Sequence, residues 1–304
     1  MDRLTAALLT VGMTQTSGMT SGIERPGLGL TVVIGGTGKT GRRVAERLVA
    51  TGHAVRVGSR AGRPAFDWAD PAGWARVIEG AEAVYVAYHP DLAFPGAAEA
   101  VGALARRAAR SGVRRVVLLS GRGEPGAQAA ERELAAAGME WAVVRASFFA
   151  QNFSEGFLVD AVRAGVLALP AAEVGEPFVD AEDLADVAVA ALAAPVAPNR
   201  VHEVTGPRLL TFAEVAAELS AAAGHEVVYL PVTRDEFVAG MVAEGVPADA
   251  AGAYGELFAE VLDGRNASVT DGVRAALGRP PRDFATYAVA AAATGVWSRS
   301  ASGR

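Results

Sequence analysis

A glycine-rich stretch, Gly35-Gly36-Thr37-Gly38-Lys39-Thr40-Gly41, carries the strongest chemical signal in this sequence of 304 residues. It lies between a short apolar run and an amphipathic segment, which predicts a turn from a first strand into a first helix. Glycine at positions 35, 38 and 41 lets the backbone turn sharply and lets main-chain amides approach a pyrophosphate. The residues expected to bind a dinucleotide here are Gly35, Thr37, Gly38, Lys39, Thr40 and Gly41.

The end of the same stretch is similar to a triphosphate-binding loop. Gly38-Lys39-Thr40 matches the last residues of a Walker A loop, but that loop requires a glycine where this sequence has Val33. A triphosphate hydrolase is therefore disfavoured. The remaining alternative is a glycine-rich strand-to-helix turn that binds no ligand.

The end of the second expected strand indicates which dinucleotide is preferred. An NAD-selective fold places Asp or Glu there to accept from the ribose 2′-hydroxyl, whereas a 2′-phosphate requires cations and hydroxyls. This sequence has Gly58-Ser59-Arg60, with no acid to repel a phosphate. We therefore expect Ser59 and Arg60 to favour NADP(H) over NAD(H), unless the arginine is only a solvated loop charge.

Further polar and aromatic residues follow the expected strands, where open α/β sheets bind ligands. Those expected to contact the cofactor are Asp67, Trp68, Ala87, Tyr88 and Ser120. Those expected to act in catalysis are Tyr88, His89, Ser120 and Asn152. Those expected to line a substrate pocket are His89, Arg122, Phe148, Phe149, Asn152, Phe178 and Tyr254. The competing interpretation is structural: core packing for the aromatic residues and a plain turn for His89.

Short apolar runs at the spacing of βα units must position these side chains. The expected strands are residues 30–34, 54–57, 83–87, 115–119 and 141–144. Continuous apolar runs are typical of strands buried on both faces of a parallel sheet. The expected helices between them are residues 41–50, 71–79, 97–110 and 126–137, each followed by a glycine that suits a left-handed helix end. The pattern predicts an α/β, doubly wound parallel-sheet Rossmann fold.

After residue 145 the pattern becomes mixed and mostly helical. Strands are expected at 166–169, 201–204 and 227–230, and helices at 180–193, 212–223, 234–243, 250–262 and 284–293. We interpret 29–155 as the dinucleotide-binding domain, rejoined by 178–205. A smaller substrate domain comprises 156–177 and 206–297, and 1–28 and 298–304 are a disordered extension and a tail.

Composition excludes several classes of protein. Cysteine is absent, which removes disulfides and sulfur-ligated metals, and the four histidines are single, so no metal is expected. A net charge of −6 argues against a nucleic-acid partner, and no apolar run reaches the length of a membrane span. We expect a cytoplasmic protein with a small-molecule substrate. Association into a homo-oligomer is left open.

Several motifs taken in order make the sequence resemble the NmrA-like branch of the atypical short-chain dehydrogenase/reductase superfamily. Besides the glycine loop, they are 57–60, 117–121, 143–146, 151–153 and 176–180 with Asp183. The resemblance covers about residues 29–297. It implies a Rossmann fold with a small C-terminal substrate domain and binding of NADP(H). Its known members range from quinone, iminium and ether reductases to nucleotide-sensing regulators without turnover.

One departure from the wider superfamily limits the chemistry. Reductases of that superfamily use a Tyr-x-x-x-Lys pair, in which the lysine lowers the pKa of the tyrosine that protonates the product alkoxide. Lys39 is the only lysine here and no tyrosine precedes a lysine by four residues. Reduction of an ordinary ketone is therefore disfavoured, whereas an iminium, a quinone or an activated enone makes a smaller demand for a proton.

The sequence thus predicts an NADPH-dependent reductase of a small conjugated acceptor. Two alternatives remain open. One is a sensor that binds NADP(H) without turnover and acts through a protein partner, which the missing Tyr-Lys pair favours. The other is a cyclase or isomerase on the same scaffold, with Glu124 or His89 as acid or base.

Overall fold

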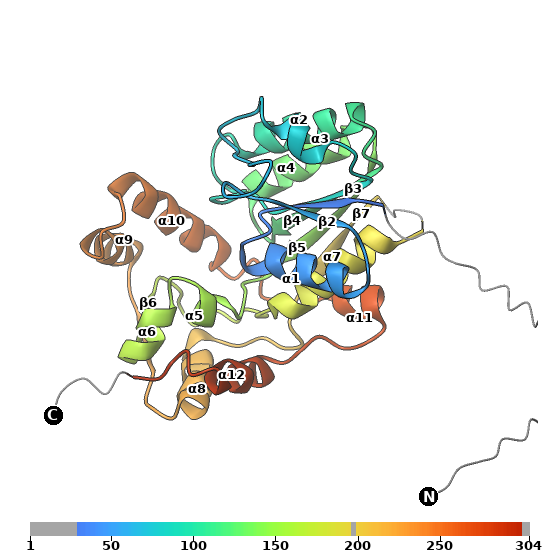
Figure 1. Cartoon of the computed structure of the whole chain (residues 1–304). Helices are drawn as coiled ribbons and strands as arrows, with labels where there is room; N and C mark the ends of the chain where they lie inside the picture. Colours follow the sequence, from blue (N-terminus) through green and yellow to red (C-terminus); the bar gives the residue numbers. More distant parts are fainter. Residues whose placement is uncertain (1–28, 196–198, 300–304) are drawn as a thin grey trace, which may run out of the picture.

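The computed structural model describes residues 29–195 and 199–299, and the expected extension 1–28 lies outside them (Figure 1). Its main sheet has six parallel strands in the order β2-β1-β3-β4-β5-β7. The strands are β1 (Thr31–Ile34), β2 (Val55–Gly58), β3 (Ala83–Val86), β4 (Arg115–Gly121), β5 (Glu140–Ala146) and β7 (Arg200–Val204). The prediction of a doubly wound parallel sheet is confirmed. The strand order reverses between β1 and β3, which is where such sheets bind ligands.

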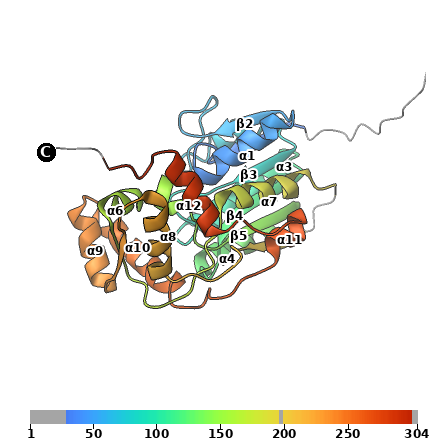
Figure 2. The ribbon, with the colours of Figure 1, turned by 90° about the horizontal axis from the view of Figure 1, so that it is seen from below.

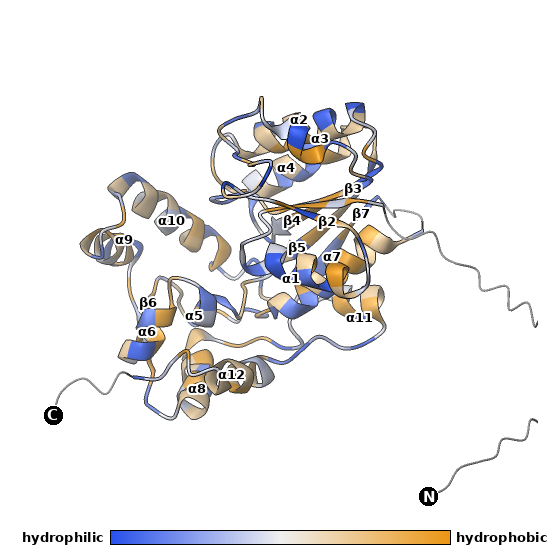
Figure 3. Ribbon diagram, viewed as in Figure 1, coloured by the Kyte–Doolittle hydropathy of each residue, from blue (hydrophilic) through white to orange (hydrophobic). Residues whose placement is uncertain are grey.

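Helices cover both faces of this sheet. They are α1 (Lys39–Ala50), α2 (Trp74–Ile78), α3 (Ala97–Arg110), α4 (Pro125–Ala135), α7 (Ala181–Ala193) and α11 (Gly272–Leu277). Figure 1 shows α2, α3 and α4 on one face and α1, α7 and α11 on the other. Each face has its own apolar core, one around Trp74 and Leu104 and the other around Leu48 and Leu184. Figure 3 shows that the main-sheet strands and α7 are largely apolar, as burial requires.

A second part of the chain builds a separate apolar cluster. Its two-stranded parallel sheet pairs β6 (Val166–Leu169) with β8 (Val228–Pro231). Its helices are α5 (Asn152–Glu155), α6 (Val159–Ala164), α8 (Phe212–Ala223), α9 (Arg234–Ala243), α10 (Ala248–Val261) and α12 (Phe284–Ala293). Phenylalanines and Trp297 fill the cluster between them. Figures 1 and 2 show α6, α9 and α10 together to one side of the main sheet.

Helix α2 begins later than expected, and helix α11 was not among the expected helices. The helix expected at 71–79 begins only at Trp74, because residues 71–73 form a turn in which Gly73 N–H donates to the Asp70 carbonyl. The helix α11 was not foreseen. It has only six residues, too few to show a periodicity, and it packs against α7 and β7. Within the described parts of the chain, no helix has the length and apolarity needed to cross a bilayer.

The start of α1 packs directly against the ends of two strands. Gly35 has φ +74°, and a Cβ there would lie 2.8 Å from the carbonyl oxygen of Ala87. A Cβ on Gly41 would lie 2.3 Å from the carbonyl oxygen of Gly35. Glycine is therefore required at both positions by backbone contact.

We expect Gly41→Ala to destabilise the fold by about 2–3 kcal/mol, because the new methyl group overlaps main-chain atoms that cannot rotate away. Gly240→Ala is the control, since its Cβ meets nothing within 4 Å in the exposed helix α9, and it should stabilise by about 0.5–1 kcal/mol. Urea unfolding measures both changes. An unchanged midpoint for Gly41→Ala would contradict the close packing described above.

Candidate active site

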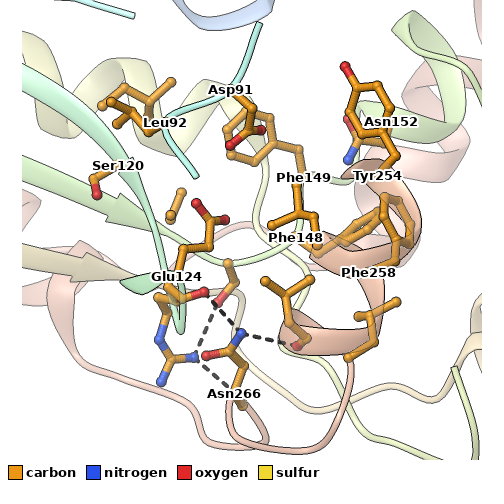
Figure 4. A pocket seen from close by; sticks show the side chains of 18 of the residues that line it. Asp91, Leu92, Ser120, Glu124, Phe148, Phe149, Asn152, Tyr254, Phe258 and Asn266 are labelled. Atoms are coloured by element: carbon orange, nitrogen blue, oxygen red, sulfur yellow. Dashed lines mark hydrogen bonds between the residues drawn. The ribbon is translucent and has the colours of Figure 1, made fainter. Parts of the chain in front are cut away.

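A cavity of about 350 Å³ lies beyond the carboxyl ends of β3, β4 and β5 (Figure 4). We call it the strand-end cavity. Its walls come from elements far apart in the sequence: the start of α1, the segments after β3, β4 and β5, and the helix α10. The residues that line it include Lys39, Tyr88, Asp91, Ser120, Arg122, Glu124, Phe148, Phe149, Asn152, Glu176, Tyr254, Phe258 and Asn266.

Most of the side chains expected in a substrate pocket line this cavity, but two do not. His89 is exposed and lies outside the lining. Phe178 also lies outside it: the ring is 2% exposed and packs against Phe148, Phe153 and Phe212. The expectation that these two residues line the pocket is wrong, because His89 turns to solvent and Phe178 belongs to the apolar cluster behind the wall.

Arg122 lines the cavity, but its guanidinium has another role. It donates to the carbonyl oxygens of Asn266 and Ser268 at 3.1 and 3.0 Å and to the hydroxyls of Ser147 and Ser268. The amide of Asn266 donates back to the Arg122 carbonyl. Arg122 thus lies in the cavity wall, as expected, and its guanidinium anchors the segment that follows α10.

The glycine loop presents the N-terminus of α1 beside the cavity, while the N–H groups of Gly35 and Gly38 donate to the carbonyl oxygens of Gly58 and Gly35. Gly38 occupies the N-cap position of α1, and Thr37 and Gly38 are exposed. The first turn of the helix, Lys39-Thr40-Gly41-Arg42, carries no acid. A helix N-terminus of this kind suits a diphosphate, because its amides point outward and its dipole favours negative charge. The residues present fit a nicotinamide dinucleotide.

The residues expected on the adenosine side lie around the end of β2. Arg60 and Asp67 are exposed and Ser59 is half-buried. Trp68 packs against Phe66, Trp74 and Tyr88, and its ring centroid is 4.6 Å from that of Tyr88. Trp68 thus has a packing role that connects the end of β2 to the cavity wall.

Lys39 reaches across to the second part of the chain. Its ammonium donates to Asn152 Oδ1 at 2.8 Å, and burial lowers the pKa of Lys39, with Glu155 opposing the effect. Asn152 begins α5, and 113 positions separate the two residues. Sequence reasoning assigned these residues to different tasks and did not foresee the contact. It connects the glycine loop to the cavity wall.

The hydroxyl of Ser120 is already engaged. It donates to Glu131 Oε1 at 2.6 Å, and Arg145 Nε donates to the same oxygen at 2.9 Å. Because its proton is used in this bond, Ser120 offers a ligand in the cavity an acceptor oxygen.

The burial of carboxyl groups in the cavity is the main feature that the sequence did not predict, although Glu124 was named as a candidate acid or base of a cyclase or isomerase. Burial is the largest cause of the raised pKa of Glu124, about 8, and of Glu176, about 7. Glu176 Oε1 accepts from the Phe148 N–H at 3.2 Å, and its other oxygen is buried without a partner among the described residues. Burial also raises the pKa of Asp91. Their residue types alone gave no signal, since acids in loops are ordinarily solvated.

Comparison with known proteins was made by sequence and by structure. No family model matches the sequence. The sequence is 32% identical to YesF, an uncharacterized oxidoreductase of Bacillus subtilis (strain 168), over 88% of this chain and 97% of that protein. It is also 32% identical to the agroclavine dehydrogenase of Claviceps fusiformis, over 84% of this chain and 95% of that enzyme.

Solved structures share the fold at lower identity. The NADPH-dependent quinone oxidoreductase QOR2 of Escherichia coli, solved with NADPH, has a TM-score of 0.72 at 19% identity and covers 85% of this chain and 98% of its own. NmrA, a negative transcriptional regulator solved with NAD, has a TM-score of 0.64 at 17% identity, with coverages of 86% and 95%. The architecture is thus that of proteins solved with nicotinamide dinucleotides.

Glu176→Gln tests the electrostatics of the cavity. The pKa of Glu176 is raised from 4.5 to about 7 in the folded state, so the folded state holds this proton more tightly than the unfolded chain. Its contribution to stability is full below pH 4.5 and is lost as the pH rises through 7. We therefore expect the stability of the variant relative to wild type to increase from pH 5 to pH 9, by up to about 3 kcal/mol.

Urea unfolding at pH 5, 7 and 9 measures this difference. The matched control is Glu173→Gln, an exposed glutamate in the same loop, which should follow the wild type at each pH. Parallel curves for Glu176→Gln and wild type would show that Glu176 is not held protonated.

Proposed function

This chain belongs to the NmrA-like group of atypical short-chain dehydrogenases/reductases and is an NAD(P)H-dependent reductase, and from that premise we propose that it transfers hydride from NADPH to a small conjugated acceptor, namely a quinone, an iminium or an activated enone. One observation carries the proposal. The same cavity has Lys39 of the glycine loop on one wall and the aromatic rings of Phe148 and Phe258 on another. A dinucleotide on the loop therefore has a chamber with aromatic walls beside it for a flat acceptor.

Residues in and around the glycine loop would bind the dinucleotide. The start of α1, from Thr37 to Gly41, would hold the diphosphate, and Ser59 with Arg60 would hold the 2′-phosphate of NADPH. Ala87, Tyr88 and Ser120 would contact the nicotinamide half, with Asp67 and Trp68 on the adenosine half. When bound, the nicotinamide supplies the hydride. We further propose that 29–155 with 178–205 form the nucleotide-binding unit and that 156–177 with 206–297 form the substrate unit, except that α5 packs with the substrate unit and α11 packs on the main sheet.

The side chains of the cavity position the acceptor and exclude water. Phe148 lies at the centre of an aromatic group, with ring centroids 5.6–5.9 Å from those of Phe178, Phe212 and Phe258, so its ring is held firmly. Tyr254 closes the cavity from α10 and packs against Phe94. A rigid aromatic wall favours flat, conjugated molecules and a dry surface for hydride transfer.

The nucleotide-sensing regulator remains the second candidate, because NmrA has the same fold and was solved with NAD. A sensor does not require an apolar cavity beside its nucleotide, and the strand-end cavity therefore favours the reductase. A panel of quinones, enones and iminium salts with NADPH separates the two functions. We expect NADPH oxidation with at least one acceptor. Tight NADPH binding without turnover of any acceptor would support the sensor.

Arg60→Ala tests the preference for NADPH. Loss of a charge-assisted contact to the 2′-phosphate should weaken NADPH binding about tenfold or more and leave NADH binding unchanged. Isothermal titration calorimetry with both nucleotides measures the two affinities. Arg76→Ala, which changes an exposed arginine on α2, is the matched control and should alter neither. Equal affinity of the wild type for NADPH and NADH would remove the proposed preference.

A further inference from the structure

Glu124 directs a carboxyl group into the strand-end cavity (Figure 4). It lies in the short turn after β4 and forms the N-cap of α4. Its carbonyl accepts from the Gln128 N–H, whereas no hydrogen bond to its carboxyl group is present in the part of the chain that the structure describes. The side chain is thus mostly buried, polar and free to interact with a molecule in the cavity.

The lack of a side chain at Gly121 makes room for this carboxyl group. A Cβ on Gly121 would lie 2.0 Å from Glu124 Oε1 and 2.3 Å from Oε2. Any other residue at position 121 would therefore displace the carboxyl group from its place beside the strand end. Glycine at position 121 thus leaves room for the carboxyl group beside the end of β4.

The groups that face Glu124 favour its protonated form. Asp91, in the segment after β3, Glu260 on α10 and Glu131 on α4 all repel a negative charge at this position. Together with burial, which is the largest cause, they raise the pKa of Glu124 to about 8. At neutral pH, the carboxyl group of Glu124 therefore retains its proton in the cavity.

The nearby cations are engaged elsewhere. The guanidinium of Arg122 donates to the carbonyl oxygens of Asn266 and Ser268. Arg265 pairs with Asp263 and Glu260 and donates to the Gly123 carbonyl. Neither guanidinium stabilises the Glu124 carboxylate, so the charges that act on it are the negative ones of Asp91, Glu260 and Glu131.

The other polar groups in the cavity have partners or are weaker acids, and Glu176, with its pKa raised to about 7, accepts from the Phe148 N–H. The proton of Ser120 is held by Glu131, and Lys39 donates to Asn152 from within the nucleotide loop. Burial raises the pKa of Tyr88 and of Tyr254, which makes both phenols weaker acids. Burial raises the pKa of Asp91 as well, but its carboxylate accepts from the Ala93 N–H at 2.9 Å, a bond that opposes this shift.

We propose that Glu124 is the proton donor of the reductase and that the enzyme consequently serves neutral acceptors, such as quinones, which become anions when they accept hydride. This inference rests on the proposed function. In the step, the acceptor gains the electron pair of the hydride, and the O–H bond of Glu124 breaks as an O–H bond forms on the acceptor oxygen. NADPH is oxidised to NADP⁺, the quinone is reduced to the hydroquinone, and the Glu124 carboxylate regains a proton from water.

Glu124→Gln with two acceptors tests the proposal. Gln matches the shape and neutrality of the protonated carboxyl group but provides no acidic proton. With menadione, a neutral quinone, we expect kcat to fall at least about tenfold. The wild-type rate should also decline above about pH 8, where Glu124 loses its proton, and this decline should disappear in the variant. An N-methylated dihydroisoquinolinium salt needs no proton, so its reduction should change less than about twofold.

A second measurement does not depend on turnover. Difference infrared spectra of wild type minus Glu124→Gln, taken from pH 6 to pH 10 without nucleotide, should contain the C=O band of a protonated carboxyl group that disappears near pH 8. Asp91→Asn removes a repelling charge and should move this transition to lower pH. Gly121→Ala should shift the band, because the methyl group displaces the carboxyl group.

The outcomes distinguish a failure of the role proposed for Glu124 from a failure of the proposed reductase function. Unchanged menadione turnover and pH profile in Glu124→Gln, with the wild type active, would overturn the assignment of Glu124 and leave the reductase intact. The lack of a protonated-carboxyl band at pH 7 would overturn it as well. If the wild type reduces no acceptor, the proposed function fails, and the role of Glu124 fails with it.

Discussion

The close approach of the glycine loop to the ends of β1 and β3 is the constraint on which the site depends. The Gly35 and Gly41 backbones touch at distances that leave no room for a Cβ, so α1 begins directly at the edge of the sheet. This places the exposed residues Thr37 and Gly38 at the start of α1, followed by Lys39, which lines the cavity. Without that contact the helix N-terminus would lie farther from the cavity, and its field would be weakened by water.

Ion pairs extend this constraint to the second part of the chain. Arg43 of α1 is buried and bonds to Glu155 of α5 at 2.9 Å and to Glu182 of α7 at 2.6 Å. Asp183, which is fully buried, pairs with Arg279 and Arg282 from the segment before α12. Such pairs contribute little net stability, because burial of charge offsets their attraction. Their geometry, however, holds α1, α5 and α7 together around Lys39 and Asn152.

The cavity itself shows how a fold without a Tyr-Lys pair can keep a proton available. Carboxyl groups come close together in a chamber lined by aromatic rings, and the arginines beside them bind carbonyl oxygens and other acids. Desolvation then disfavours charge on the carboxyl groups and raises their pKa values toward the physiological range. The aromatic wall thus affects the acidic groups directly, because it excludes water from the carboxyl groups and so raises their pKa values.

The sequence alone determined what depends on local pattern. Helices 97–110, 212–223, 234–243 and 284–293 agree with the structure at both ends, and the order of apolar runs predicted the doubly wound sheet. Periodicity and capping residues decide these features, and both depend only on residues that are close together in the sequence. The glycine loop was found for the same reason, because a strand, a turn and a helix follow each other directly.

Only the tertiary structure decided which side chains meet in the cavity. It turned His89 outward and buried Phe178, and it brought Lys39 to Asn152 across 113 positions. It also withdrew Glu124 and Glu176 from water, which no inspection of neighbouring residues reveals. Burial and charge at a site arise from segments distant in the chain, and so the acidity of a group follows from the packing of the whole fold.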